Sequence, residues 1–302
     1  MFEAELARIG RRRPDVVAVT AAMPHPAGLT TFAGECPDRV YDVGIAEQHA
    51  VTSAAGMAMA GLHPVVAIYA TFLNRALDQV LLDVGLHGLA VTFVLDRAGV
   101  TGNDGPSHHG MWDFSLLGTV PGMRVAAPRD AARLRELLAE AVADERGPTA
   151  VRFPKGATPA DLPAVGQIGR ADVLLAGAAP DVLLLAAGAM AQPACAAADD
   201  LAASGVGVTV VDPRWVLPVD PALARAAARY RRVVTVEDHG LAGGFGDAVS
   251  RALRAARVRV EIQTLGLTQA YLRHGDRRDL LREQGLDAPG IAAAIRDHLH
   301  RS

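Results

Sequence analysis

Short runs of valine, isoleucine and leucine recur along the chain between longer segments rich in alanine, leucine and arginine, and this alternation restricts the fold most. The short runs have the length of strands and the longer segments have helical period, which is typical of βαβ units around a mainly parallel sheet. A chain of 302 residues, 50% of them hydrophobic, is long enough for two cores of ordinary size. We therefore expect an α/β protein with two consecutive parallel-sheet domains.

The first domain is expected over residues 1–160 and the second over residues 161–302. A segment rich in Pro and Gly, Phe153–Gly169, has no sustained period and is predicted to link them. The expected strands are Val16–Thr20, Val65–Tyr69, Thr92–Asp96, Arg124–Ala126, Val182–Ala187, Val206–Asp212, Val233–Glu237 and Val258–Thr264. The expected helices are Ala46–Ala60, Ala76–Leu86, Arg129–Asp144, Pro193–Ser204, Pro221–Tyr230 and Gly246–Ala256.

Charge and cysteine content exclude several classes of protein. The 30 basic and 33 acidic residues leave a formal charge of -3 without a long block of one sign, which argues against nucleic acid or an anionic membrane as partner. Cys36 and Cys195 lie too far apart to indicate a zinc site or a disulfide framework, so we expect a reducing cytoplasm. Two long uncharged stretches, Gln48–Asn74 and Val182–Ala198, contain Gly and Pro that divide each into a helix and a strand, so no membrane span is predicted.

One acidic residue stands out. Glu47 is placed in the first turn of a helix that is otherwise made of small apolar residues, so its side chain should be substantially buried. A buried carboxyl group is expensive unless a donor reaches it or a proton stays on it. On this ground alone Glu47 is either a capping carboxylate or a functional group.

Several long motifs resemble one enzyme family. DVGIAEQHA, GLHPVVAIYATFLNRALDQVLLD, DRAGVTGNDGPSHHGMWD and AVRFPKG resemble the pyrimidine-binding domain of 1-deoxy-D-xylulose-5-phosphate synthase, a thiamine-diphosphate enzyme of the transketolase type. The resemblance is colinear from about Phe2 to Gly156. It continues more loosely into the C-terminal domain through VEDHGLAGGFG and GLTQAYLRHGDRRDLLREQGLDAPGI. Motifs of this length in the same order are far more specific than one short pattern.

The resemblance assigns roles to the cofactor pocket. It implies that Glu47 hydrogen-bonds a ring nitrogen of the cofactor's aminopyrimidine, and that Phe72 stacks on this ring. Tyr69 and Arg75 match residues that line the substrate channel. Without the motif, Phe72 could be a core residue, and Tyr69 with Arg75 could be a solvated surface pair.

The resemblance also implies an acceptor site. Arg97 and Lys155 match two basic residues that hold the phosphate of glyceraldehyde 3-phosphate, although many members have arginine in place of Lys155. Arg152 either shares this task or pairs with an acidic neighbour. His108 and its neighbour Asp104 match the groups that handle protons at the reacting carbonyl. The adjacent His109 is expected to be only solvated and is not assigned to the site.

Complete family members carry an earlier domain with a GDG motif that binds Mg²⁺ and the cofactor diphosphate, and no such motif occurs here. The resemblance therefore implies a partner subunit that holds Mg²⁺ and the diphosphate of thiamine diphosphate, in an α2β2 heterotetramer. We expect a split synthase that decarboxylates pyruvate and passes the two-carbon unit to an aldehyde. The alternatives are a split transketolase, another thiamine-dependent transferase of specialised metabolism, and a non-catalytic partner subunit.

Overall fold

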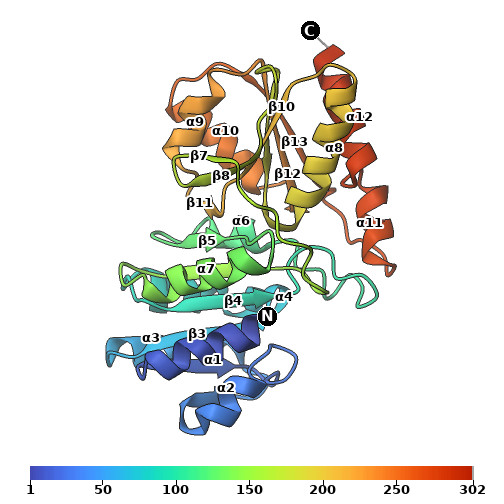
Figure 1. Ribbon diagram of the computed structural model, residues 1–302. Coiled ribbons are helices and arrows are strands. Elements are labelled where there is room, and N and C mark those ends of the chain that lie inside the picture. The colour runs from blue at the N-terminus through green and yellow to red at the C-terminus, as the bar shows by residue number, and fades with distance from the viewer. Residues whose placement is uncertain (301–302) are drawn as a thin grey trace.

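Seven strands form the first sheet of the structure, a computed structural model that describes residues 1–300. They are β1 (Val16–Thr20), β2 (Val40–Asp42), β3 (His63–Tyr69), β4 (Thr92–Asp96), β5 (Arg124–Ala126), β6 (Thr149–Arg152) and β11 (Trp215–Leu217). Their order is β11-β5-β6-β4-β3-β1-β2, and all neighbours are parallel except β11, which runs antiparallel to β5. This sheet occupies the lower half of Figure 1.

The helical elements of this half pack on the sheet and on one another. They are α1 (Phe2–Arg12), α2 (Thr30–Glu35), η1 (Pro37–Arg39), α3 (Glu47–Met59), α4 (Ala70–Leu73), η2 (Asn74–Ala76), α5 (Leu77–Gln79), η3 (Val80–Gly85), α6 (Asp113–Leu117) and α7 (Ala131–Ala143). Helix α3 packs against β3, and α1 contacts α7. The carboxylate of Asp130 accepts a hydrogen bond from the amide of Arg133 and so begins α7.

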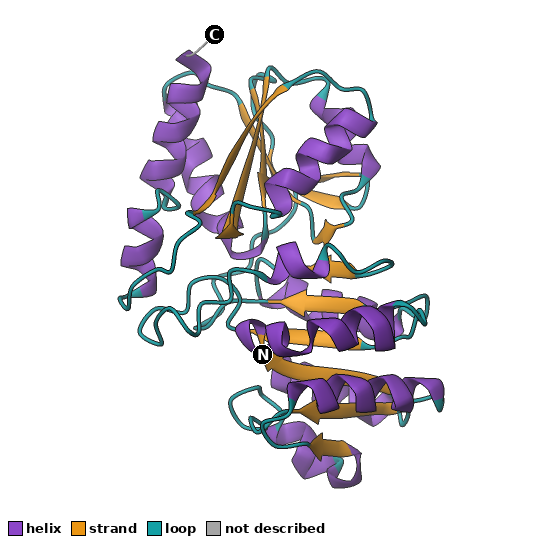
Figure 2. Cartoon of the chain, turned by 180° about the vertical axis from the view of Figure 1, so that it is seen from behind, coloured by secondary structure: helices purple, strands orange, loops and turns teal. Residues whose placement is uncertain are grey.

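The second sheet has six strands and lies above the first in Figure 1. Its strands are β7 (Gly166–Ile168), β8 (Ala171–Leu175), β9 (Val182–Ala186), β10 (Val208–Asp212), β12 (Arg232–Gly240) and β13 (Glu261–Leu267). The order is β13-β12-β9-β10-β8-β7, and β8 and β7 are antiparallel to their neighbours. Figure 2 shows helices on both sides of this sheet. They are η4 (Gly188–Met190), α8 (Ala191–Ala203), α9 (Pro221–Ala227), α10 (Phe245–Ala255), α11 (Arg277–Glu283) and α12 (Ala288–His300).

The predicted fold class is confirmed, since the two sheets are mostly parallel and carry helices. Two local predictions were wrong. The helix expected over Ala76–Leu86 is broken into 3-10, α and π turns, and the expected linker Phe153–Gly169 contains strand β7. The division of the chain after residue 160 stays a prediction. Strand β11 lies beyond that residue and yet pairs with β5 of the first sheet.

No helix within residues 1–300 is long and apolar enough to span a membrane.

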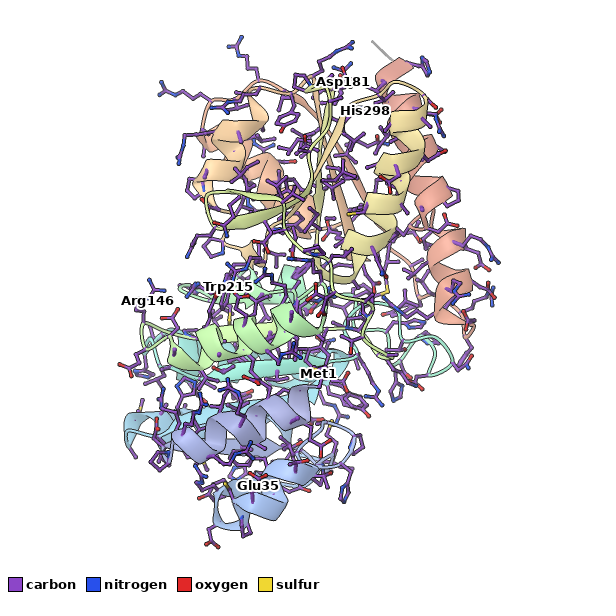
Figure 3. All side chains as sticks on the ribbon, viewed as in Figure 1. Met1, Glu35, Arg146, Asp181, Trp215 and His298 are labelled. Atoms are coloured by element: carbon purple, nitrogen blue, oxygen red, sulfur yellow. The ribbon has the colours of Figure 1, made fainter. Side chains whose placement is uncertain are left out.

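A buried arginine ties the two sheets together. The guanidinium of Arg129, just before α7, is 2.7 Å from the carboxylate of Asp172 in β8 and 2.6 Å from that of Asp212 in β10. The side chains of all three are at most 2% exposed. A buried ion pair fixes the relative position of the segments that carry it, because separating its members leaves a buried charge without a partner. Trp215 of β11 lies at the same junction (Figure 3).

The glycine-rich turn between β12 and α10, residues 241–244, does not form a phosphate-binding loop. The side chain of Glu237 accepts hydrogen bonds from the amides of Phe245 and Gly246, at 2.6 and 2.8 Å, and so fills the N-terminus of α10. A carboxyl group of the chain itself therefore occupies the place an anion would take. Burial raises the pKa of Glu237 to about 8.

Replacing Glu237 with Gln should change how stability depends on pH. The pKa of Glu237 is higher in the folded than in the unfolded protein. Its contribution to the free energy of unfolding is therefore greatest below the unfolded-state pKa and is lost as pH rises through the folded-state pKa. The loss is at most about 1.4 kcal/mol per pH unit. Urea unfolding at several pH values between 5 and 9 should show a shallower decline for Glu237→Gln than for the wild type. If the free energy of unfolding fell equally with pH in the two proteins, the raised pKa of Glu237 would be contradicted.

Candidate active site

The predicted site residues gather at the carboxyl edge of the first sheet, where open α/β sheets bind ligands. Each one ends a strand or follows its carboxyl end, so segments far apart in sequence meet there. Glu47 follows β2, Tyr69, Phe72 and Arg75 end or follow β3, Arg97, Asp104 and His108 follow β4, and Arg152 and Lys155 end or follow β6.

The carboxylate of Glu47 is nearly out of solvent, as predicted, at 3% exposure. It stands at the first residue of α3, where the free amides and the helix dipole favour a negative charge. Its ion-pair partner is Arg75, whose guanidinium lies 3.3 Å from the carboxylate and whose side chain is 56% exposed. The carboxylate is thus held by one long contact that a ligand could replace.

Glu47 lines a cavity of about 540 Å³. Its aromatic wall is made by Tyr69 and Phe72, whose rings stack at 5.5 Å between centroids, and the ring of His108 meets Phe72 edge-on at 5.5 Å. Burial raises the pKa of the Tyr69 phenol. A carboxyl group facing an aromatic wall suits a flat heteroaromatic ring that can stack and accept or donate a hydrogen bond. The other lining residues are Ala21, Ala22, Met23, Ile45, Thr71, Arg75 and Ser107.

Two cations at the same edge of the sheet share one carboxylate. The ammonium of Lys155, the chain's only lysine, is 2.8 Å from both carboxylate oxygens of Asp104. The guanidinium of Arg97 covers the Tyr69 ring at 3.9 Å and approaches Asp104 at 3.8 Å. The hydrogen bond from Lys155 lowers the pKa of Asp104. Paired positive groups of this kind can bind an anion.

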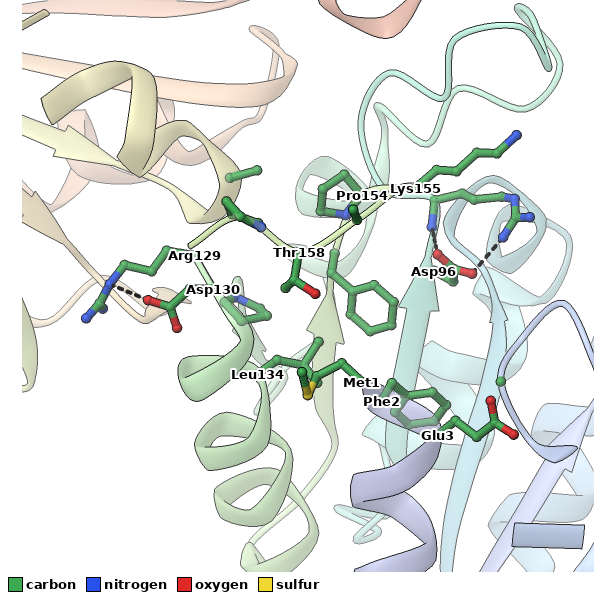
Figure 4. A pocket seen from close by; sticks show the side chains of 18 of the residues that line it. Met1, Phe2, Glu3, Asp96, Arg129, Asp130, Leu134, Pro154, Lys155 and Thr158 are labelled. Carbon is green, nitrogen blue, oxygen red and sulfur yellow. Dashed lines mark hydrogen bonds and ion pairs between the residues drawn. The ribbon is translucent and has the colours of Figure 1, made fainter. Parts of the chain in front are cut away.

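The backbone of Arg97 is left-handed, with φ of 60°, a conformation that non-glycine residues rarely adopt. The carboxylate of Asp96 stabilises it by accepting from the Arg97 amide at 2.7 Å and from its guanidinium at 2.6 Å. Asp96 was not among the predicted residues, although its place at the end of β4 could have indicated it. Asp96 and Lys155 lie on one side of a second cavity of about 340 Å³ and Arg129 with Asp130 on the other (Figure 4).

Arg152 does not join the two cations. Its side chain is 4% exposed and its guanidinium contacts the carboxylate of Asp113 at 2.8 Å and the carbonyl oxygen of Asp238 at 3.0 Å. Of the two alternatives for this residue, the structure shows pairing with an acidic neighbour. The expectation that His109 is solvated was wrong, since it is only 1% exposed.

Comparison with known proteins shows what the chain resembles. Residues 1–160 match the family model for the pyrimidine binding domain of transketolase, and residues 169–291 match that for the transketolase C-terminal domain. The chain is 59% identical over 299 residues to the 1-deoxy-D-xylulose-5-phosphate synthase of Thermobifida fusca, covering 98% of this chain and 47% of that protein. It is also 59% identical over 302 residues to synthase 1 of Kitasatospora griseola, covering 100% and 46%. The chain thus spans about half the length of these curated relatives.

Two solved structures are similar in fold. One is described as a split gene transketolase, an inactive β4 tetramer; it is 28% identical, has a TM-score of 0.85, and the match covers 98% of this chain and 95% of that one. The other is the transketolase of Campylobacter jejuni, with a TM-score of 0.80 at 17% identity, covering 98% of this chain and 46% of that one. At that identity the second match shows the fold alone.

The low pKa of Asp104 should depend on Lys155. In Lys155→Met the pKa of Asp104 is expected to rise toward its ordinary value, because the hydrogen bond from the ammonium is the main cause of the shift. Carboxyl-carbon NMR titration measures this, and Lys155→Arg, which keeps a charged donor, serves as the control. An Asp104 pKa that does not move in Lys155→Met would show that the pair does not form in solution.

Proposed function

Because the chain belongs to the transketolase family, of which it carries the pyrimidine-binding and C-terminal domains, we propose that it forms the pyrimidine-binding half of a thiamine-diphosphate-dependent synthase. The reaction we propose is decarboxylation of pyruvate and transfer of the two-carbon unit to an aldehyde such as glyceraldehyde 3-phosphate. The observation that carries the proposal is the buried carboxylate of Glu47, which faces an aromatic-walled cavity large enough for a heteroaromatic ring.

The residues of this cavity fit the aminopyrimidine end of thiamine diphosphate. When bound, this cofactor supplies a carbon nucleophile and an electron sink, which the side chains of proteins lack. Glu47 would exchange its long contact with Arg75 for a hydrogen bond to a ring nitrogen, and its low-dielectric surroundings would strengthen that bond. Phe72 would stack on the ring, and burying such a ring contributes about 1 to 3 kcal/mol.

The ring of His108 contacts Phe72, which lines this cavity, and Asp104 of the same loop pairs with Lys155. His108 is proposed to transfer a proton to or from the carbonyl oxygen of the donor or acceptor, since imidazole exchanges protons readily near neutral pH. Asp104 is proposed to orient the reacting groups through its contacts with the neighbouring cations.

Arg97 and Lys155 are proposed to hold the phosphate of the acceptor aldehyde, with Tyr69 and Arg75 lining the approach to it. The ammonium of Lys155 is a compact charge that can follow a phosphate oxygen, whereas Arg97 is oriented by Tyr69 and Asp96. Arg152 is not part of this proposal, because its side chain is only 4% exposed and its Nε and Nη2 donate to Asp113 and to the carbonyl of Asp238.

A diphosphate-binding domain with Mg²⁺ completes the proposed enzyme. The chain covers only 47% of the Thermobifida fusca relative, and it matches a split gene transketolase over 95% of that chain. These two findings support a partner that brings the diphosphate-binding half, and we propose that the two kinds of chain assemble as an α2β2 heterotetramer. The two unpaired cysteines, Cys36 and Cys195, support a location in the reducing cytoplasm.

One alternative is a split transketolase or another thiamine-dependent transferase, which the match to the split gene transketolase favours. A non-catalytic partner subunit would not need the carboxylate, the aromatic wall and the two cations at one strand edge. The choice between synthase and transketolase depends on the donor, because the first consumes pyruvate and the second a ketose phosphate.

Glu47→Gln should lower pyruvate consumption by about 10²- to 10³-fold, because the amide cannot share a proton with the cofactor ring. The assay combines this chain with the diphosphate-binding half, thiamine diphosphate and Mg²⁺, and follows pyruvate in the presence of glyceraldehyde 3-phosphate. Glu145→Gln makes the same chemical change at an exposed glutamate and should leave the rate unchanged. Turnover of a ketose phosphate without consumption of pyruvate would favour the transketolase alternative.

Lys155→Met should raise the KM for glyceraldehyde 3-phosphate about tenfold, the effect of losing one charge-assisted contact to a phosphate. Lys155→Arg should retain most of the affinity. Unphosphorylated glyceraldehyde is the matched substrate, and its KM should change little in either variant. Equal increases in KM for both aldehydes would remove Lys155 from the phosphate site.

A further inference from the structure

The loop that carries Asp104 and His108 is closed at its base. Gly99 and Gly110 exchange two backbone hydrogen bonds, at 2.7 and 2.8 Å, so residues 99–110 form a closed loop at the end of β4. Both proposed functional side chains belong to this loop. A loop of this kind can hold its side chains in place only if further contacts fix it, because backbone left without contacts gains conformational entropy.

We propose that the second domain positions this loop, with Asp238 and Arg277 as positioning residues and His109 as a second tether. The catalytic meaning of the inference rests on the proposed function, whereas the restraint on the loop does not. Asp238 lies in β12 and Arg277 begins α11, so both come from outside the sheet that bears the site.

An ion pair of the second domain hydrogen-bonds both the amide and the carbonyl group of Val100. The amide of Val100 donates to the carboxylate of Asp238 at 2.9 Å, and its carbonyl oxygen accepts from the guanidinium of Arg277. Asp238 and Arg277 are themselves 2.6 Å apart, and the side chain of Asp238 is 3% exposed. A backbone bond to a buried charged group is stronger than one between neutral groups. Val100 is therefore fixed where the loop leaves its base.

Two glycines of the loop, Gly99 and Gly105, lie against residues of the second domain. A Cβ on Gly99 would stand 2.1 Å from the Asp238 carboxylate, and one on Gly105 would stand 2.1 Å from the ring of His274. The φ angles of these two glycines are 73° and 80°, which side chains also disfavour. The sequence of the loop thus accommodates close contact with residues from the other domain.

His109 makes an independent tether beside His108. Its Nδ1 accepts from the amide of Thr101 at 3.0 Å, which places the ring proton on Nε2, and Nε2 donates to the carbonyl oxygen of Arg273 at 3.3 Å. Burial lowers the pKa of His109, in keeping with a neutral ring in this position. The residue next to the proposed proton carrier is therefore bonded to the second domain.

The two domains do not depend on this contact to stay together. The pairs of Arg129 with Asp172 and Asp212, and the pairing of β11 with β5, join them elsewhere. Loss of the Arg277 contact should therefore loosen residues 99–110 without separating the sheets. This distinguishes a positioning role from a purely structural one.

Amide hydrogen exchange of the full chain, followed by mass spectrometry, tests the restraint without any catalysis. Arg277→Ala should accelerate exchange in peptides covering 99–110 by about tenfold or more, equivalent to about 1.4 kcal/mol, and leave β3 unchanged. Arg277→Lys should restore part of the protection. Arg278→Ala is the matched control, an exposed arginine in the next position of the same helix.

Equal exchange of residues 99–110 in the Arg277→Ala and Arg278→Ala proteins would overturn the proposal, and so would acceleration spread evenly over all peptides. If Arg277→Ala does not fold, His109→Ala gives the same test at the second tether, with local acceleration over 99–110 as the expected result and no acceleration as the contrary one.

The reconstituted enzyme supplies a second readout. Arg277→Ala should lower kcat about tenfold while the KM for pyruvate stays within about twofold, because displaced reacting groups affect the rate more than binding. Arg277→Lys should recover much of kcat. If exchange of residues 99–110 is accelerated in Arg277→Ala but the wild-type enzyme does not turn over pyruvate, the proposed function is refuted and the positioning role is kept. If the wild-type enzyme turns over pyruvate but exchange is unchanged in Arg277→Ala, the positioning role is refuted and the proposed function is kept.

Discussion

A carboxylate that is almost sealed from solvent at the start of a helix is the constraint around which this site is organised. Glu47 is stabilised there by the free amides of α3 and by one long contact to Arg75. Isolated buried charge is unfavourable, so the position remains acceptable only while a donor faces it. Arg75 is exposed and can move away, which in the proposed function would free the carboxylate for a ring nitrogen of the cofactor.

The parallel sheet brings the remaining groups to that carboxylate. Because β1, β2, β3, β4 and β6 run in one direction, the segments that follow them open at one edge. The aromatic wall comes from the end of β3 and from α4, and the cations follow the ends of β4 and β6. The left-handed backbone of Arg97, supported by Asp96, directs one of these cations toward Tyr69.

The second domain is joined to the first through buried charged groups. Two buried charged residues bridge the halves of the chain: Arg129 pairs with Asp172 and Asp212 of the second half, and Asp238 accepts hydrogen bonds from Val100 and Arg152 of the first. Asp238 connects the ends of β4 and β6 to α11, because its carboxylate accepts from Val100 and pairs with Arg277 while its carbonyl accepts from Arg152. The geometry of the first-domain loop therefore depends on residues more than a hundred positions away.

The sequence by itself determined the helices, the strands and the burial that depend on local pattern. Helix α3 and strand β3 begin and end within two residues of the prediction, and the burial of Glu47 follows from the small residues around it. Tertiary structure alone decided the short strands β7 and β11, which are defined by their pairing partners and not by period. It also decided that Arg152 pairs with Asp113 and that His109 is buried, since both outcomes depend on side chains from distant segments. Local periodicity reports the face that a residue presents, whereas the partner that meets that face is set by how the two sheets pack.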